Sequence, residues 1–169
     1  MNLHIGGKER KDGWKILNVQ PGPNVDYVGD FRDLSQFGDG SVETVYASHV
    51  LEHVAQTEVV PVLRGIHRAL QPGGRLLVSV PDMDTLCHLF ISPWASPQVK
   101  WHAMRMIFGG QVDQHDFHFV GFNEQFLRTF FAEAGFGQVQ RVISLGVFQD
   151  TSDYRPYGFP ISLNMIAVK

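Results

Sequence analysis

The stretch Leu70–Asp82, LQPGGRLLVSVPD, decides the fold class of this chain. Its second half, Arg75–Val80, is a near-continuous apolar run, which is typical of a strand buried on both faces within a parallel sheet. The segment before it begins near Thr57 and places Leu63 and Ile66 on one face, at the spacing of an α-helix that the Pro-Gly-Gly turn ends. A helix that leads directly into a buried strand is the repeating unit of an α/β fold.

The same alternation continues toward both ends of the chain. Apolar segments bounded by Gly, Pro and Asp predict further strands at Leu3–Ile5, Lys15–Val19, Val25–Val28, Val42–Ala47, Gln138–Ser144 and Ser162–Val168. The middle of the chain is irregular, with helices expected near Asp84–Phe90 and Gln98–Phe108, and with Trp94 and Trp101 in the core or in a lid. Asn123 is expected to cap a last helix that ends before Gly135. Its inward face should carry Phe126, Leu127, Phe130, Phe131 and Ala134.

The composition indicates one globular domain over residues 1–169, with 44% hydrophobic and 18% charged residues. A formal net charge of −3 and the lack of a basic stripe argue against nucleic acid as a partner. Cys87 is the single cysteine, which excludes an intramolecular disulfide and suits a reducing compartment. The first residues form no apolar signal core and no run reaches the length of a membrane span. We therefore expect a cytoplasmic protein that binds no membrane.

The first connections in this sheet are unusually short. A parallel crossover normally needs about a dozen residues including a helix, and the links before Lys15–Val19 and Val25–Val28 are shorter than that. One face of the sheet near the N-terminus would then lack a covering helix. We expect a partner subunit in a homodimer, or the middle segment 83–120, to cover it.

Five turns follow the carboxyl ends of the strands and should meet at one edge of the sheet. Ligands of doubly wound sheets bind beyond these ends, so we expect the ligand there. Glycines there let a backbone approach a ligand closely, Asn18 can hydrogen-bond a ribose diol, and Asp30 can accept from an adenine amino group with Phe31 against the ring. The turns are Gly6-Gly7, Asn18, Gly29-Asp30-Phe31, Ser48-His49 and Pro81-Asp82.

The segment His49-Val50-Leu51-Glu52-His53 also matches H-x-x-E-H, a pattern of zinc peptidases with two His ligands and a Glu base. His49, however, follows its strand at once, and the segment breaks again near Thr57. A catalytic zinc needs a third ligand, and no downstream carboxylate stands out. We therefore expect no metal. Glu52 and His53 then either cap and hydrogen-bond a loop or act directly in catalysis.

A second histidine cluster precedes the last helix. His115, Asp116 and His118 lie in QVDQHDFHFVGF and could hold a metal, but a loop histidine more often serves as a hydrogen-bonding group. We favour the hydrogen-bonding interpretation.

The order of these motifs resembles that of the class I S-adenosylmethionine-dependent methyltransferases over nearly the whole chain. The resemblance is greatest to short members in which Gly13-Trp14 lie close to the first strand. It implies a Rossmann-like sheet, mostly parallel with an antiparallel last strand and shortened first crossovers. It also implies S-adenosylmethionine as cofactor and methyl transfer to a small-molecule acceptor. Where that acceptor carries a proton, His53 or His118 is the candidate general base. The motifs are the strand ending in Gly-Gly, the strand ending in Asn18, GDxxDL at Gly29–Leu34, SVETVYASHVLEH at Ser41–His53, LQPGG and AEAGF at Ala132–Phe136. The implied cofactor contacts are Gly6, Gly7, Asn18, Asp30, Phe31, Ser48 and His49.

Two departures from the family pattern leave alternatives open. The usual G-x-G-x-G is reduced to Gly6-Gly7-Lys8, and Asn18 stands where an acidic residue is usual, which weakens ribose binding by about 1 kcal/mol. The missing helix after the first strand removes a dipole for the cofactor carboxylate, and Lys8 or Arg10 either replaces it or lies in a solvated loop. The chain could therefore be an inactive methyltransferase-like binding or assembly domain. A zinc hydrolase is the third hypothesis.

Overall fold

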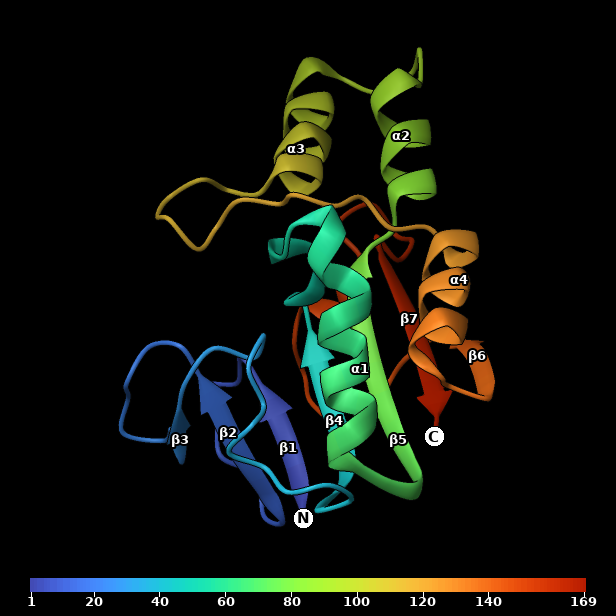
Figure 1. The fold of residues 1–169 in the computed structure, drawn as a ribbon. Helices are drawn as coiled ribbons and strands as arrows, with labels where there is room; N and C mark the ends of the chain where they lie inside the picture. The colour runs from blue at the N-terminus through green and yellow to red at the C-terminus, as the bar shows by residue number, and fades with distance from the viewer.

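Seven strands form one sheet in the order β3-β2-β1-β4-β5-β7-β6 in the computed structural model, which describes all residues 1–169 (Figure 1). Strands β1 to β5 are parallel, and β7 is antiparallel to both β5 and β6. The predicted fold class is therefore confirmed. The strands are β1 (Asn2–Ile5), β2 (Trp14–Asn18), β3 (Tyr27–Val28), β4 (Val42–Ser48), β5 (Leu70–Pro81), β6 (Gln138–Val142) and β7 (Ser162–Val168).

The helices form two groups (Figure 1). Helices α1 (Val59–Ala69) and α4 (Glu124–Ala134) lie side by side on one face of the sheet, whereas α2 (Met83–Ile91) and α3 (Pro97–Phe108) project as a pair beyond its carboxyl edge. Helix α1 begins at Val59 rather than near Thr57, because the 3-10 turn η2 (Gln56–Glu58) precedes it. The expected cap of α4 is correct, with Phe126 N donating to Asn123 Oδ1 at 2.9 Å. The remaining short turns are η1 (Leu51–His53) and η3 (Thr151–Asp153).

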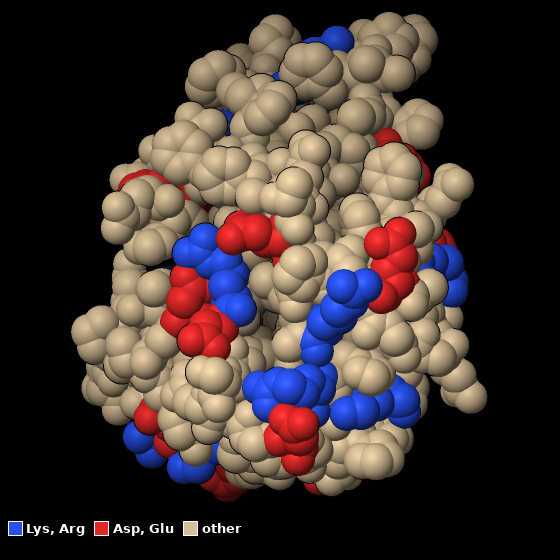
Figure 2. Space-filling model, viewed as in Figure 1, with Lys and Arg blue, Asp and Glu red and all other residues tan.

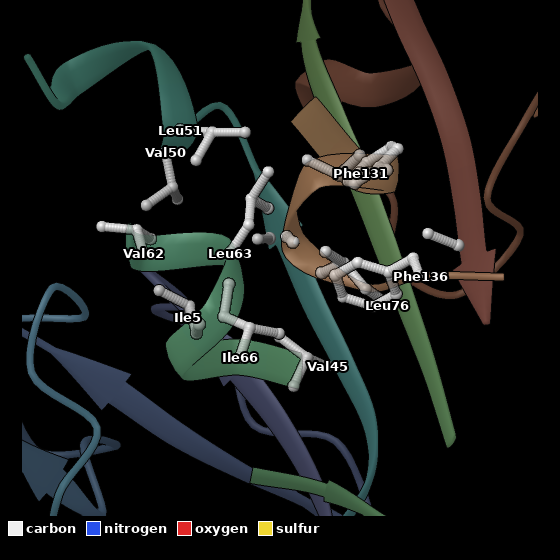
Figure 3. Packing of buried hydrophobic residues seen from close by; sticks show 14 of the residues in the cluster. Ile5, Val45, Val50, Leu51, Val62, Leu63, Ile66, Leu76, Phe131 and Phe136 are labelled. Atoms are coloured by element: carbon white, nitrogen blue, oxygen red, sulfur yellow. The ribbon is translucent and has the colours of Figure 1, made fainter. Parts of the chain in front are cut away.

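The main core fills the space between the sheet and the α1–α4 layer. It contains 28 buried residues, among them Leu63 and Ile66 of α1 against Val45 of β4, and Phe131 of α4 beside Leu76 of β5 (Figure 3). Burying each such side chain stabilises the fold by about 1.5–3 kcal/mol. The list of inward residues on α4 was wrong at Phe126, which is 53% exposed. Phe126 stays outside because α4 presents only one narrow stripe to the sheet.

The opposite face of the sheet is covered by the connection between β6 and β7, residues 143–161. Phe148 from this connection packs on His4 and Tyr46, with ring centroids 4.1 and 4.8 Å away. Burial raises the pKa of the Tyr46 phenol, which stays protonated and donates to Asp150 Oδ2 at 2.8 Å. The sequence had suggested a partner subunit or the segment 83–120 as the cover of this face, and neither is needed. The homodimer was expected because this face was predicted to be bare. That reason no longer holds, and the homodimer stays an untested prediction.

The α2–α3 pair has several exposed apolar side chains, among them Phe90, Ile91 and Phe108. Trp94 is 92% and Trp101 63% exposed, so neither lies in the core, and the alternative expectation of a lid stays a prediction. In the face shown in Figure 2, charged side chains of both signs are interspersed over the sheet and α1, and few lie over α2 and α3. No helix has the length and apolarity that a membrane crossing requires.

Candidate functional site

The candidate site lies where the strand order reverses, between β1 and β4, at the carboxyl ends of the strands. The turn after β1 packs directly on the turn after β4, because a Cβ on Gly6 would lie 2.9 Å from Val50 Cγ2. Gly6 also has φ of +76°, which strains any other residue. The close approach of these two turns therefore requires glycine at this position.

Gly7 and Asn18 connect the ends of β1 and β2. Asn18 Nδ2 donates to Gly7 O at 3.1 Å, and Asn18 Oδ1 accepts from Gln20 N at 3.0 Å. A Cβ on Gly7 would lie 2.5 Å from His4 Nδ1, so the glycine makes room for a buried ring. Both polar atoms of the Asn18 amide are thus already bonded, the nitrogen to the loop after β1 and the oxygen to its own loop.

Asp30 follows β3 and is bonded within its own turn. Its Oδ1 accepts from Arg32 N and its Oδ2 from Arg32 Nε, both at 2.9 Å. The hydrogen bond from Arg32 holds the pKa of Asp30 below its usual value. Phe31 is half-buried against the main core. An adenine amino group could reach Asp30 only after Arg32, whose side chain is 51% exposed, moves aside.

Ser48 and His49 form the turn after β4. Ser48 Oγ is buried and has no hydrogen-bond partner, a state that native structures rarely leave uncompensated. His49 has φ of 53°, and its ring Nε2 lies 3.0 Å from Ser162 Oγ, which donates in turn to Thr151 O. The turn is therefore held rigidly against β7 and offers one free hydroxyl.

Glu52 lies directly behind this turn and is fully buried. Its Oε1 is 3.2 Å from His49 Nδ1 and 3.9 Å from His118 Nε2, but neither carboxylate oxygen has a hydrogen bond of adequate geometry. Burial acts to raise the pKa of Glu52, but the surrounding imidazoles, His49 foremost, outweigh it, and the pKa lies below its usual value. The main chain of Glu52 is well bonded, with its carbonyl accepting from Phe119 N at 2.8 Å.

The structure brings together His53 and His118, the two residues expected as alternative bases. Their ring centroids are 4.9 Å apart, and both rings face Glu52. Burial lowers the pKa of His118, with Glu52 acting in the opposite direction. His115 and Asp116 do not join this group. His115 is exposed, and Asp116 Oδ2 accepts from Val112 N at 3.3 Å.

Two hollows lie away from these turns. One of about 560 Å³ lies between α2 and α3 and is lined by Phe90, Trp101 and Met104. The other, of about 730 Å³, surrounds η3 and its flanking residues Asp150 and Arg155. Neither contains a residue expected from the sequence to bind the cofactor. The candidate site is therefore located by the strand order and by the polar residues of the turns, and not by these two hollows.

Comparison with known proteins agrees with this topology. Residues 9–78 match the family described as a methyltransferase domain. An uncharacterized methyltransferase of Synechocystis is 26% identical over 105 residues, which cover 58% of this chain and 49% of that protein. An uncharacterized transposon protein of Streptomyces fradiae is 39% identical over 59 residues, 35% of this chain and 16% of that protein. The matched regions thus span about half or less of these curated relatives.

Solved structures share the whole fold. A SAM-dependent methyltransferase from Archaeoglobus fulgidus superposes with a TM-score of 0.62 at 14% identity, covering 99% of this chain and 85% of that one. A didemethyltoxoflavin N1-methyltransferase from Burkholderia thailandensis, solved with S-adenosylhomocysteine, gives 0.60 at 18% identity, covering 99% and 70%. The sheet and its switch point define a protein of the methyltransferase fold. The chain is thus similar to methyltransferases in sequence over residues 9–78 and in fold over nearly its whole length.

Proposed function

We propose that this protein transfers the methyl group of S-adenosylmethionine to a small-molecule acceptor. The observation that carries the proposal is the set of turns at the β1–β4 switch point, because open α/β sheets bind their ligands there. The bound cofactor supplies a methyl group already activated on a sulfonium. The chain then has to hold donor and acceptor in line and keep water out.

The residues at the switch point fit the cofactor in part. Gly6 is exposed at the turn after β1, and the buried Ser48 hydroxyl lacks a partner that a ligand would provide. Asn18 would hold the ribose and Asp30 the adenine amino group, with Phe31 against the ring and His49 fixing the turn. Asn18 and Asp30 would each first give up a hydrogen bond within their own loop.

We expect the cofactor to bind weakly, for two reasons: the occupied polar side chains and the lack of a helix after β1. The loop after β1 contains no helix, so the cofactor carboxylate lacks a helix N-terminus and depends on exposed cations such as Lys8 or Arg10. We expect micromolar affinity or weaker, since each lost charge-assisted bond costs about 1.5–3 kcal/mol. Where the acceptor carries a proton, His53 or His118 would remove it.

A second candidate is a methyltransferase-like domain that binds or assembles without turnover. The specific observation in its favour is that the polar atoms of Asn18 and Asp30 are already used within the apo loops. Under this hypothesis, cofactor binding is absent even in fully folded protein.

Calorimetric titration with S-adenosylhomocysteine, with NAD as a control ligand, tests the proposal. We expect one site per chain and a raised melting temperature. Ser48→Ala should weaken binding about five- to tenfold without lowering the stability of the apo protein, because its hydroxyl has no partner to lose. Ser41→Ala, an exposed serine before β4, is the matched control. Absence of heat at millimolar ligand would favour the inactive domain.

A further inference from the structure

The geometry points to a divalent transition-metal site formed by Glu52, His53 and His118. One ligand atom from each lies within 4.8 Å of the other two. The three side chains come from the turn after β4 and from the segment that leads to α4, so only the folded chain brings them together. The site adjoins the proposed cofactor crevice but shares none of its residues.

Each of the two rings keeps one nitrogen free to bind an ion. His53 Nδ1 lies 2.9 Å from Phe117 O, and His118 Nδ1 lies 3.0 Å from Met106 O. A carbonyl only accepts, so each Nδ1 carries the proton and each Nε2 is left as the unprotonated nitrogen. Histidine ligands of metals are usually fixed in this way, by a hydrogen bond from the other ring nitrogen.

The carboxylate supplies the second, independent observation. Glu52 is fully buried, and neither of its oxygens has a hydrogen-bond partner. A buried carboxylate without hydrogen-bond partners costs several kcal/mol, which a coordinated cation would remove. His49 Nδ1 lies 3.2 Å from Oε1, and the ring of His49 is itself held by Ser162. His49 is therefore a positioning residue rather than a ligand.

The ligand set selects the ion. Two imidazole nitrogens and one carboxylate oxygen suit Zn²⁺ or another first-row transition metal, whereas Mg²⁺ and Ca²⁺ prefer oxygen ligands. Two ligands bound at about 2.1 Å can be at most about 4.2 Å apart. The 3.9 Å between His118 Nε2 and Glu52 Oε1 already meets this limit. The widest separation, within 4.8 Å, needs less than about 1 Å of closure.

The site differs from the one that H-x-x-E-H suggests. His49 does not bind the ion, Glu52 is a ligand rather than a base, and the third ligand is His118 from far along the chain. The expectation of no metal depended on the lack of a third ligand, which the fold supplies. Three protein ligands leave a position for water or substrate. A bound ion would use the lone pairs of both histidines, so neither could then act as general base.

Zinc binding to the full chain, stripped with a chelator and dialysed, tests the site without cofactor or turnover. We expect one Zn²⁺ per chain by elemental analysis, micromolar or tighter affinity by calorimetry, and a raised melting temperature. Co²⁺ should give the visible absorption of a low-symmetry site, and Mg²⁺ should give no response. The readout requires no S-adenosylmethionine, so this proposal and the methyltransferase proposal fail separately.

His53→Ala, His118→Ala and Glu52→Gln should each weaken zinc binding about 100-fold or more, since even the loss of an outer-shell partner costs 10–100-fold. His115→Ala and His88→Ala remove exposed histidines and should bind like the unaltered protein. His53 is only partly buried, so His53→Ala keeps the test valid if the variants of buried Glu52 or His118 do not fold. Stoichiometric zinc retained by folded His53→Ala, or no zinc bound by the unaltered chain, would overturn the site.

Discussion

Acidification should destabilise this protein through His4, and His4→Phe should remove that effect. His4 lies in β1 with only 8% of its surface exposed, and its Nδ1 has no hydrogen-bond partner. Phe148 and Tyr46 pack against its ring. Burial lowers the pKa of His4 from 6.5 to about 4, with Asp150 opposing the shift. The folded protein therefore keeps this ring neutral where the unfolded chain protonates it.

The sign and the size follow from proton linkage. Between the two pKa values the unfolded chain binds more protons, so the free energy of unfolding rises with pH in this range. The contribution of neutral His4 is complete above the unfolded pKa and is lost as the pH falls from 6.5 toward about 4. The difference between those pKa values corresponds to about 3 kcal/mol in full, and to about 2 kcal/mol by about pH 5. This is a large part of the 5–15 kcal/mol typical of a whole domain.

Urea denaturation followed by circular dichroism, at about pH 8 and about pH 5, measures the effect. The unaltered protein should lose about 2 kcal/mol more than His4→Phe between these conditions. Phenylalanine keeps an aromatic ring against Phe148 and cannot be protonated. His88→Gln, which removes an exposed histidine, should behave like the unaltered protein. Equal losses in the unaltered protein and in His4→Phe would refute the reasoning.

Three further substitutions test the loops and the second sheet face. Gly7→Ala should lower stability by about 1–3 kcal/mol in thermal melts, because its Cβ would lie 2.5 Å from His4 Nδ1; an unchanged melting temperature would show that the ring has room to move. Tyr46→Phe removes the 2.8 Å bond to Asp150 and should cost about 1–2 kcal/mol in urea, and no loss would mean that this bond does not hold the segment 143–161. Asn18→Asp loses its donor to Gly7 O and should destabilise the apo protein by about 1 kcal/mol, while two charged acceptors tighten S-adenosylhomocysteine binding about fivefold. Affinity that stays constant or falls would remove Asn18 from the site.

Local patterns predicted the elements of this fold well. Segments between Gly and Pro turns located every strand, and the signal is strongest in β5, where burial on both faces leaves a near-continuous apolar run. Strand β3 is shorter than expected because Asp26 turns back to accept from Ile16 N at 2.9 Å, which ends regular pairing there. Phe126 was misplaced because hydrophobicity alone does not say how wide a stripe α4 buries.

Long-range contacts could not be predicted. The pairing of His53 with His118, and the orphaned state of Glu52 between them, depend on how the segment before α4 crosses the turn after β4. The sequence marked both histidines as chemical candidates but gave no reason to combine them. The same holds for Arg32, whose bonds to Asp30 are visible only in three dimensions. A charged residue two positions away is the sole local hint of that pair.

The late position of residues 143–161 in the chain also affects how the protein folds. Tyr46 and Asp150, which join this segment to β4, are 104 residues apart in sequence. During synthesis, β1 and β4 therefore emerge long before the part that shields their second face from water. Contacts of such high sequence separation slow folding, because the loop-closure entropy must be overcome before burial rewards it. The nascent chain is thus expected to expose an apolar sheet surface until residues 143–161 are made, and this stage is the one most open to chaperone capture or aggregation.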